Sequence, residues 1–255
     1  MRNARDPTPT PTGVRLDQDG PVATVTLCRP ESLNPQTPAL WHRLRDIGRE
    51  LPGDVRMVVV RGEGRAFSSG LDLNAVSVAE LARVPDPELE RRIATYQEAF
   101  AWLRRADLVS IAAVQGYAIG AGFQLALACD LRVLASDAAF SMAEIRLGLV
   151  PDLGGTRRLV DLVGYARALE LCLTGREVGA EEAYRIGLAA LVVPRPELDG
   201  AVADLVSALL AAPRGAVSEI KSLLSRAAGH SYAEQEAAER EAQVRRIRDL
   251  ADPRE

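Results

Sequence analysis

The chain has 255 residues, of which 47% are hydrophobic and 26% charged, and its formal net charge is −4. This composition is typical of a globular protein with a hydrophobic core, and it excludes a strongly basic surface for nucleic acid or an anionic membrane. The three cysteines are widely spaced, which argues against a disulfide framework, and no pair has metal-ligand spacing. No apolar run reaches transmembrane length, so we expect a cytoplasmic protein without a metal site.

The first half of the chain predicts strands that alternate with helices. Residues 1–13 are rich in Pro and Thr and indicate a flexible tail, and residues 74–88 lose periodicity and contain two prolines, which predicts a loop. Strands are predicted within 14–28 (two, around a turn), 55–60, 109–114 and 131–135, and helices at 37–51, from about 93 to 103, and at 120–129. Strand, helix and strand at this spacing indicate a parallel sheet in an α/β fold.

The second half of the chain is mostly helical. Helices are predicted at 155–163, 166–173, 180–186, 198–211, 216–228 and 232–250, with one strand-like run at 190–193. The last helix is long and highly charged, which favours a position in solvent or on a subunit interface over a position in a core.

Two glycine-bearing turns follow buried strands. They are residues 64–73 (GRAFSSGLDL) and residues 115–124 (QGYAIGAGFQ), and the second opens a helix. Glycine lets the backbone approach a ligand, and the first amides of a helix have no partners within it. Two such turns side by side would offer a pair of main-chain N–H donors, as an oxyanion hole requires. The plain alternative is that both turns are only tight connections.

Two other enzyme classes fit the residues less well. Gly120 and Gly122 follow a strand and begin a helix, as in dinucleotide-binding folds, but Leu125 stands where the third glycine belongs. Ser68 and Ser69 lack the Gly-x-Ser-x-Gly arrangement of a serine hydrolase.

Together the motifs resemble the enoyl-CoA hydratase/isomerase (crotonase) family. The resemblance runs from about residue 14 to about residue 228 and includes AFSSGLDL (66–73), GYAIGAG (116–122), ACDLR (128–132), FSMAEIRLGLVP (140–151) and GGTRRL (154–159). It implies a spiral of ββα units with two nearly perpendicular sheets in residues 14–195. It also implies a C-terminal helical region in residues 196–255 that forms a homotrimer, or a dimer of trimers.

The resemblance assigns the binding of an acyl-CoA thioester to named positions. The N–H groups of Leu71 and Ala121 would form the oxyanion hole. Lys221, which the sequence places on an exposed helix face, would reach a CoA phosphate. The remaining positions expected to bind the substrate or its CoA are Ala66, Ser68, Gly70, Asp72, Leu73, Asn74 and Gly120. No separate cofactor is implied, because CoA arrives as part of the substrate.

The acid and base groups decide which reaction follows. Hydratases of the family use two glutamates; the second matches Glu144, but Gln124 stands at the first position, and an amide cannot take a proton. A lone Glu144 indicates proton transfer of the Δ3,Δ2-enoyl-CoA isomerase type. The alternatives are a hydratase or other lyase in which Gln124 orients water, and an acyl-CoA-binding protein without catalysis. Asp152 is a further carboxylate nearby, predicted to cap the helix that begins near Gly154 rather than to act in catalysis.

Overall fold

The computed structural model describes residues 12–251, so the tail predicted for residues 1–13 lies almost wholly outside the described residues. The strands are β1 (Val14–Asp19), β2 (Val22–Leu27), β3 (Pro35–Gln36), β4 (Met57–Gly62), β5 (Gly70–Leu71), β6 (Val109–Val114), β7 (Tyr117–Ile119), β8 (Leu131–Ala135), β9 (Ala139–Ser141), β10 (Val178–Gly179) and β11 (Leu191–Val193). The helices are α1 (Pro38–Glu50), α2 (Val78–Leu81), α3 (Asp86–Ala101), α4 (Ala121–Ala128), α5 (Gly155–Val163), α6 (Tyr165–Thr174), α7 (Ala180–Arg185), α8 (Leu198–Ala211), α9 (Arg214–Ala227) and α10 (Tyr232–Ala251). Short 3₁₀ turns are η1 (Pro30–Ser32), η2 (Trp102–Arg104), η3 (Ala143–Leu147) and η4 (Arg195–Glu197).

The largest sheet is almost entirely parallel. Its strand order is β1-β2-β4-β6-β8-β11, and only the β1–β2 hairpin is antiparallel. β6 is buried along its whole length, which explains its continuous apolar sequence, because helices cover both faces of a parallel sheet. The α/β fold predicted from the strand–helix alternation is confirmed.

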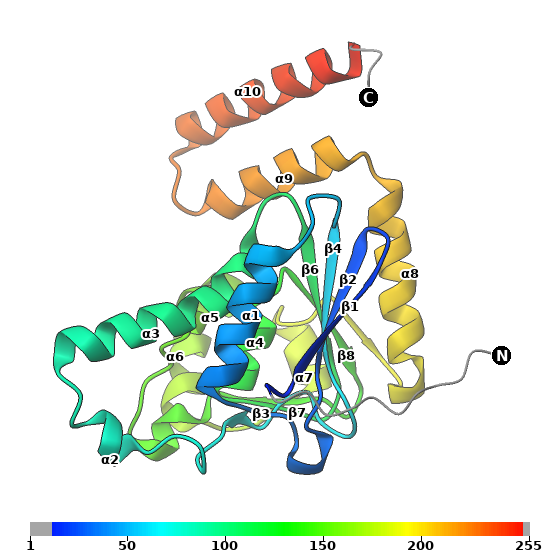
Figure 1. Ribbon diagram of the computed structural model, residues 1–255. Coiled ribbons are helices and arrows are strands. Elements are labelled where there is room, and N and C mark those ends of the chain that lie inside the picture. The colour runs from blue at the N-terminus through cyan, green and yellow to red at the C-terminus, as the bar shows by residue number, and fades with distance from the viewer. Residues whose placement is uncertain (1–11, 252–255) are drawn as a thin grey trace.

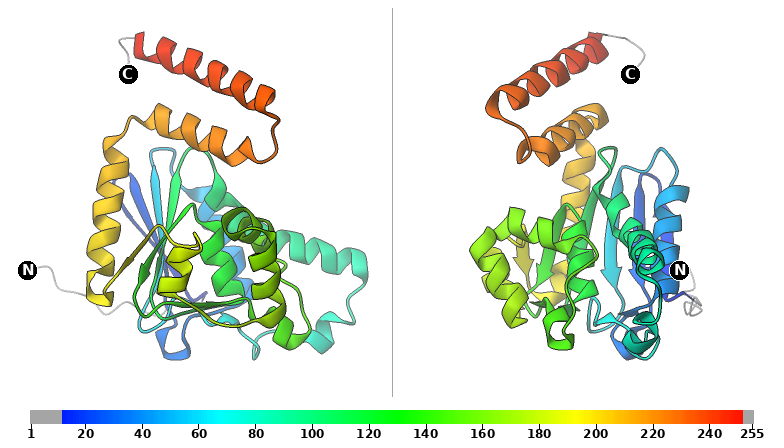
Figure 2. Two further views of the ribbon diagram at one scale, coloured as in Figure 1. Left: turned by 180° about the vertical axis from the view of Figure 1, so that it is seen from behind. Right: turned by 90° about the vertical axis from the view of Figure 1, so that its left-hand side faces the viewer.

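The two faces of this sheet carry two hydrophobic cores. Alternate residues of one strand point to opposite faces, so Val58 and Val60 pack on the α1 and α4 side while Met57 and Val59 pack toward α8. Figure 2 shows α8 running along the outer face of the sheet, opposite the helices of the first half of the chain. The rigid sheet therefore holds the turns at its strand ends in fixed positions.

Two smaller sheets lie at those strand ends. One has the order β10-β9-β7 and the other pairs β3 with β5, and Figure 1 shows β3 and β7 running crosswise beneath the large sheet. A parallel bridge between Ser68 and Ala118 joins the two predicted glycine turns. These strands of two or three residues are too short for a two-residue period, and the sequence indicates them only as turns.

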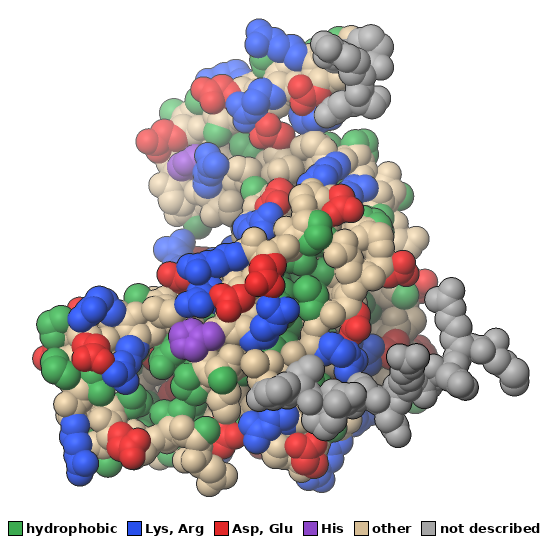
Figure 3. All heavy atoms as spheres, viewed as in Figure 1, with side chains coloured by type: hydrophobic (Ala, Val, Ile, Leu, Met, Phe, Trp, Pro, Cys, Tyr) green, Lys and Arg blue, Asp and Glu red, His purple; other side chains and the backbone are tan. Residues whose placement is uncertain are grey.

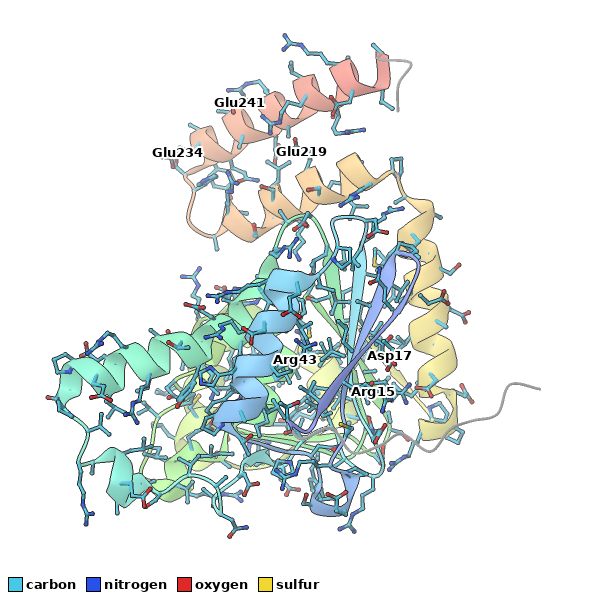
Figure 4. The ribbon with its side chains drawn as sticks, in the orientation of Figure 1. Arg15, Asp17, Arg43, Glu219, Glu234 and Glu241 are labelled. Carbon is cyan, nitrogen blue, oxygen red and sulfur yellow. The ribbon has the colours of Figure 1, made fainter. Side chains whose placement is uncertain are left out.

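The last two helices form an α9–α10 hairpin, here called the arm (residues 214–251), in which α9 lies at the end of the large sheet and α10 lies farther out (Figure 1). Glu219 extends from α9 toward α10, where its carboxylate accepts two hydrogen bonds from Arg245 at 2.7 and 2.9 Å (Figure 4). Within residues 12–251 no single helix is long and apolar enough to cross a membrane, and only the bent pair 195–211 and 214–227 meets both criteria together.

The loop predicted at residues 74–88 is only partly correct. The segment contains the single turn of α2, and α3 already begins at Asp86 with Pro87 in its first turn. Proline lacks an N–H, but the first turn of a helix needs none of its N–H groups for internal bonds, so Pro87 starts the helix instead of preventing it.

Candidate active site

The two glycine turns meet at the start of α4. Gly70 has a φ of +87°, and a Cβ placed on it would lie 2.4 Å from the carbonyl oxygen of Ile119 and 3.5 Å from the main-chain nitrogen of Ala121. Any side chain at position 70 would therefore collide with the backbone of the second turn. Glycine at this position brings β5 against the first residue of α4, as the sequence predicted.

Two main-chain N–H groups, of Ala121 and Leu71, belong to the two segments that meet here. Ala121 is the first residue of α4, so its N–H has no acceptor within the helix. Leu71 pairs with Gln36 in the β3–β5 ladder, in which Asp72 donates its N–H to the carbonyl of Gln36. In a parallel ladder the residues on either side of Leu71 make those bonds, which leaves the N–H of Leu71 directed away from β3. Two such donors have the character of an oxyanion hole.

Glu144 lies directly beside these amides. It belongs to η3, and its Oε1 and Oε2 are 3.3 and 3.8 Å from the position that a Cβ on Gly120 would occupy. Oε1 accepts a hydrogen bond of 2.7 Å from Nε2 of Gln124, whereas Oε2 is buried and has no partner among the described residues. An unpartnered buried carboxylate oxygen is costly, so it marks a place where a ligand is expected.

The surroundings of Glu144 favour its protonated form. Burial raises the pKa of Glu144, and the nearby charge of Asp152 adds to that rise, while hydrogen bonds from its own backbone and from Gln124 oppose it. A carboxylate with a raised pKa is suited to both taking and returning a proton near neutral pH. Burial also raises the pKa of Asp152 itself.

The predicted cap at Asp152 is wrong. The N-cap of α5 is Gly154, which has no side chain to accept the first N–H groups of the helix. That function falls to Gln124, whose Oε1 accepts hydrogen bonds from the N–H groups of Leu153 at 2.9 Å and Gly155 at 3.2 Å. The sequence does not predict these two amide donors, of which Gly155 belongs to the motif at residues 154–159 and Leu153 directly precedes it.

One further residue near the carboxylate was missed. Cys172, on α6, lies close enough to Glu144 for the glutamate charge to raise the pKa of its thiol, after the larger effect of burial. Its apolar sequence setting predicted only a small buried side chain, because contact with residue 144 depends on how α6 packs against η3.

The residues predicted to bind CoA differ in exposure. Ala66 and Ser68 are completely buried, and the Ser68 hydroxyl donates to the carbonyl of Asn34 at 2.8 Å. Asp72 is nearly buried and pairs with Arg29 at 2.9 Å. Leu73 and Asn74, which follow β5, are exposed. Contact between CoA and any of these residues stays a prediction.

The exposed position predicted for Lys221 is wrong. Its side chain is 12% exposed, and its Nζ donates to Oδ2 of Asp130 at 2.6 Å and to the carbonyl of Leu108 at 2.7 Å. Asp130 also accepts hydrogen bonds from the N–H and hydroxyl of Ser110. Helix periodicity shows which residues share a face, but not that this face packs on the body of the protein.

Residues 12–251 contain no cluster of three or more His, Cys, Asp or Glu side chains suited to a metal ion. The fold is a mixed α/β fold, and its two glycine turns bring the backbone of Leu71 and Ala121 close to the carboxylate of Glu144. The family model for enoyl-CoA hydratase/isomerase matches residues 17–250, and the chain belongs to this family.

Individual relatives agree with that membership. A probable enoyl-CoA hydratase of Mycobacterium bovis is 33% identical over 187 residues, which cover 72% of this chain and 70% of the relative. The peroxisomal Δ(3,5)-Δ(2,4)-dienoyl-CoA isomerase of Arabidopsis thaliana is 35% identical over 181 residues, 68% of this chain and 65% of the relative.

Solved structures share the fold. A Thermobifida fusca protein assigned as an enoyl-CoA hydratase, crystallised with CoA, is 51% identical, with a TM-score of 0.90 and coverage of 94% of this chain and 95% of that one. A second Thermobifida fusca structure with the same assignment was crystallised with acetoacetyl-CoA. It is 50% identical to this chain, with a TM-score of 0.89, and the match covers 93% of this chain and 96% of that one.

Proposed function

We propose that the protein is an acyl-CoA isomerase of the Δ3,Δ2-enoyl-CoA type, in which Glu144 is the only carboxylate that moves the proton. The observation that carries this proposal is the buried Oε2 of Glu144, which has no partner among the described residues and lies beside Gly120. The other oxygen of the carboxylate is engaged by Gln124, so Oε2 is the atom free to meet a substrate C–H group.

The proposed reaction needs one base and one oxyanion hole. The thioester oxygen of a 3-enoyl-CoA accepts the N–H groups of Leu71 and Ala121, which makes the protons on C2 more acidic. Glu144 removes one C2 proton, and the electron pair spreads over C2, C4 and the thioester oxygen as a dienolate. The protonated Glu144 then returns the proton to C4, which leaves the 2-enoyl ester and the ionised carboxylate. No water enters, and atoms and charge balance.

The substrate class is supported by the crystallised relatives. The Thermobifida fusca structures contain CoA and acetoacetyl-CoA in a fold that matches nearly the whole of this chain. We propose that CoA follows the turn at residues 66–74, whose outer residues Leu73 and Asn74 are exposed. If Lys221 contacts CoA, its ammonium group must either give up its hydrogen bond to Asp130 or bind Asp130 and CoA at the same time.

A hydratase or related lyase is the second candidate. The relatives named as hydratases favour it, and Asp152 supplies a second half-buried carboxylate close enough to affect Glu144. In that reaction Gln124 would orient the attacking water and Glu144 would transfer the protons. Mass spectrometry separates the candidates, because hydration adds one water to the substrate and isomerisation adds nothing.

We propose that the arm joins copies of this chain into a homotrimer or a dimer of trimers. α9 has no buried residue, and the arm exposes apolar side chains at Ile220, Leu224, Val244, Ile247 and Leu250. Figure 3 shows hydrophobic side chains among the charged ones on the arm. Leu224→Asp should lower the mass measured by light scattering, whereas the control Ser225→Asp, on an exposed neighbour, should not.

The test of the proposed activity compares wild type with Glu144→Gln on a 3-enoyl-CoA. Wild type should form the 2-enoyl ester without a change of mass, and the variant should lose roughly 10²- to 10⁴-fold in kcat, the usual contribution of a general acid–base group. Glu181→Gln, an exposed change on α7, is the matched control and should keep full activity. Unchanged turnover in Glu144→Gln would remove the basis of the proposal.

A further inference from the structure

We infer that Gln124 is a positioning residue: its amide, held in one orientation by the residues that begin α5, donates to Glu144 and keeps that carboxylate charged and directed at the substrate. The inference rests on the proposed function in one respect, that Glu144 is the base. The oxygen of the same amide is occupied by two main-chain donors, so it does not accept a hydrogen bond from water.

The orientation of the amide follows from its three hydrogen bonds. Oε1 accepts the N–H groups of Leu153 and Gly155, and Nε2 donates to Oε1 of Glu144. If the amide were flipped, its NH₂ group would lie against the N–H groups of Leu153 and Gly155, and its oxygen would lie against the carboxylate of Glu144. All three bonds would then be lost in a buried place, so only one orientation is stable.

The surrounding chain keeps the amide in that place. Gln124 is 1% exposed, and a Cβ on Gly155 would lie 2.7 Å from its Cγ and 3.0 Å from its Oε1. The start of α5 therefore packs directly on the Gln124 side chain through a residue that has none. The oxygen that would accept a hydrogen from water is already occupied by two main-chain donors.

The groups around Glu144 show that the hydrogen bond from Gln124 favours the charged form of the carboxylate. The titratable groups facing Glu144 are Asp152, just before α5, and Cys172 on α6. Burial and Asp152 raise the pKa of Glu144, and the thiol of Cys172, whose own pKa is raised, is neutral and does not offset them. Gln124 is the one neighbouring side chain that lowers it. The two amides on Oε1 polarise the Gln124 amide and strengthen its donation to the carboxylate.

A glutamate at position 124 would reverse this effect. It would accept the same N–H groups at the positive end of α5, so its ionised form would be stabilised there. Two carboxylates at hydrogen-bond distance cannot both ionise easily, and the pair would hold one proton between them. The residue at position 124 thus selects between a lone ionised base and a carboxylate pair that shares a proton.

The test reads the protonation of Glu144 directly. The infrared carboxyl band of Glu144, identified by its loss in Glu144→Gln, is titrated against pH in wild type, Gln124→Met and Gln124→Glu. The pH profile of kcat for the 3-enoyl-CoA is measured in parallel. Gln97→Met is the matched control, because Gln97 donates to the main-chain oxygen of Asp152 and, among the described residues, makes no hydrogen bond to the carboxylate of Glu144.

Gln124→Met should move both the infrared midpoint and the acid limb of kcat to higher pH, while Gln97→Met leaves both unchanged. Gln124→Glu should keep one proton on the pair at neutral pH and lower isomerisation there by at least about tenfold, with recovery as the pH rises. If Gln124→Met does not fold, Gln124→Glu carries the test alone. An unchanged midpoint in the folded variant would overturn the inference. Absence of isomerase turnover in wild type would instead overturn the proposed function, because the infrared titration needs no turnover.

Discussion

The contact between Lys221 and Asp130 should contribute a large part of the attachment of the arm to the body. The two side chains are 12% and 17% exposed, and their charged atoms lie 2.6 Å apart. α9 has no buried residue of its own, and this pair is the salt bridge between that helix and the body among the described residues. Lys221→Met removes the cation and leaves Asp130 charged in a mostly buried place.

The magnitude follows from what Asp130 keeps. Removing one partner of a buried ion pair costs about 3–5 kcal/mol. Asp130 keeps its hydrogen bonds from Ser110 and a longer ion pair with Arg158 at 3.9 Å, which place the cost near the lower end, about 3 kcal/mol. For a chain of this size that free energy corresponds to a fall in Tm of roughly 6–12 °C. Asp130→Asn in the Lys221→Met background removes the carboxylate charge that has lost its nearer cation and should recover most of the loss.

Scanning calorimetry of the two single variants and the double variant at neutral pH measures this coupling. A Tm of Lys221→Met within 1–2 °C of wild type, on the order of the scatter among surface substitutions, would refute the reasoning. The same variants address the CoA contact proposed for Lys221. A rise in KM for acyl-CoA without a loss of Tm would show that Lys221 leaves Asp130 for the ligand.

Three further predictions concern the site. Burial raises the pKa of Glu144 above the ordinary value of a glutamate, so the folded protein holds its proton to higher pH than the unfolded chain does. Wild-type stability therefore falls as the pH rises from the ordinary carboxyl range through the raised pKa of Glu144. Glu144→Gln should therefore have a higher Tm than wild type at neutral pH and no advantage at pH values below the ordinary carboxyl range, as calorimetry can show. Gly70→Ala should abolish turnover, since its Cβ meets backbone at 2.4 Å, whereas Gly20→Ala, with a φ of +53° and open space, should lose only stability. Gly155→Ala should lower kcat by displacing the glutamine amide, whereas the helical control Gly200→Ala should leave kcat unchanged.

The sequence was informative wherever a pattern extended over several residues. The strand at 109–114 and the helices at 155–163 and 198–211 have the predicted bounds. Their periodicity reflects burial on one or both faces, which local sequence records well. The meeting of the two glycine turns was also predicted, since residues that follow adjacent parallel strands lie at the same sheet edge.

Other features depend on contacts between distant segments and left no local pattern. The orientation of Gln124 depends on amides twenty-nine and thirty-one residues away, at Leu153 and Gly155. Lys221 is held by Leu108, just before β6, and by Asp130 in the turn before β8, which its own helix does not indicate. α3 starts early because proline is compatible with a first helical turn, a choice that the loss of periodicity alone could not reveal.

The central claim is that Glu144 alone carries a proton from C2 to C4. The most direct measurement supplies a 3-enoyl-CoA deuterated at C2 and locates the label in the product by NMR and mass spectrometry. The account predicts an unhydrated 2-enoyl ester with a measurable fraction of the deuterium at C4, because the same carboxyl group removes and returns it. A product that has gained water, or a 2-enoyl ester whose C4 holds only solvent hydrogen, would contradict a single-carboxylate mechanism.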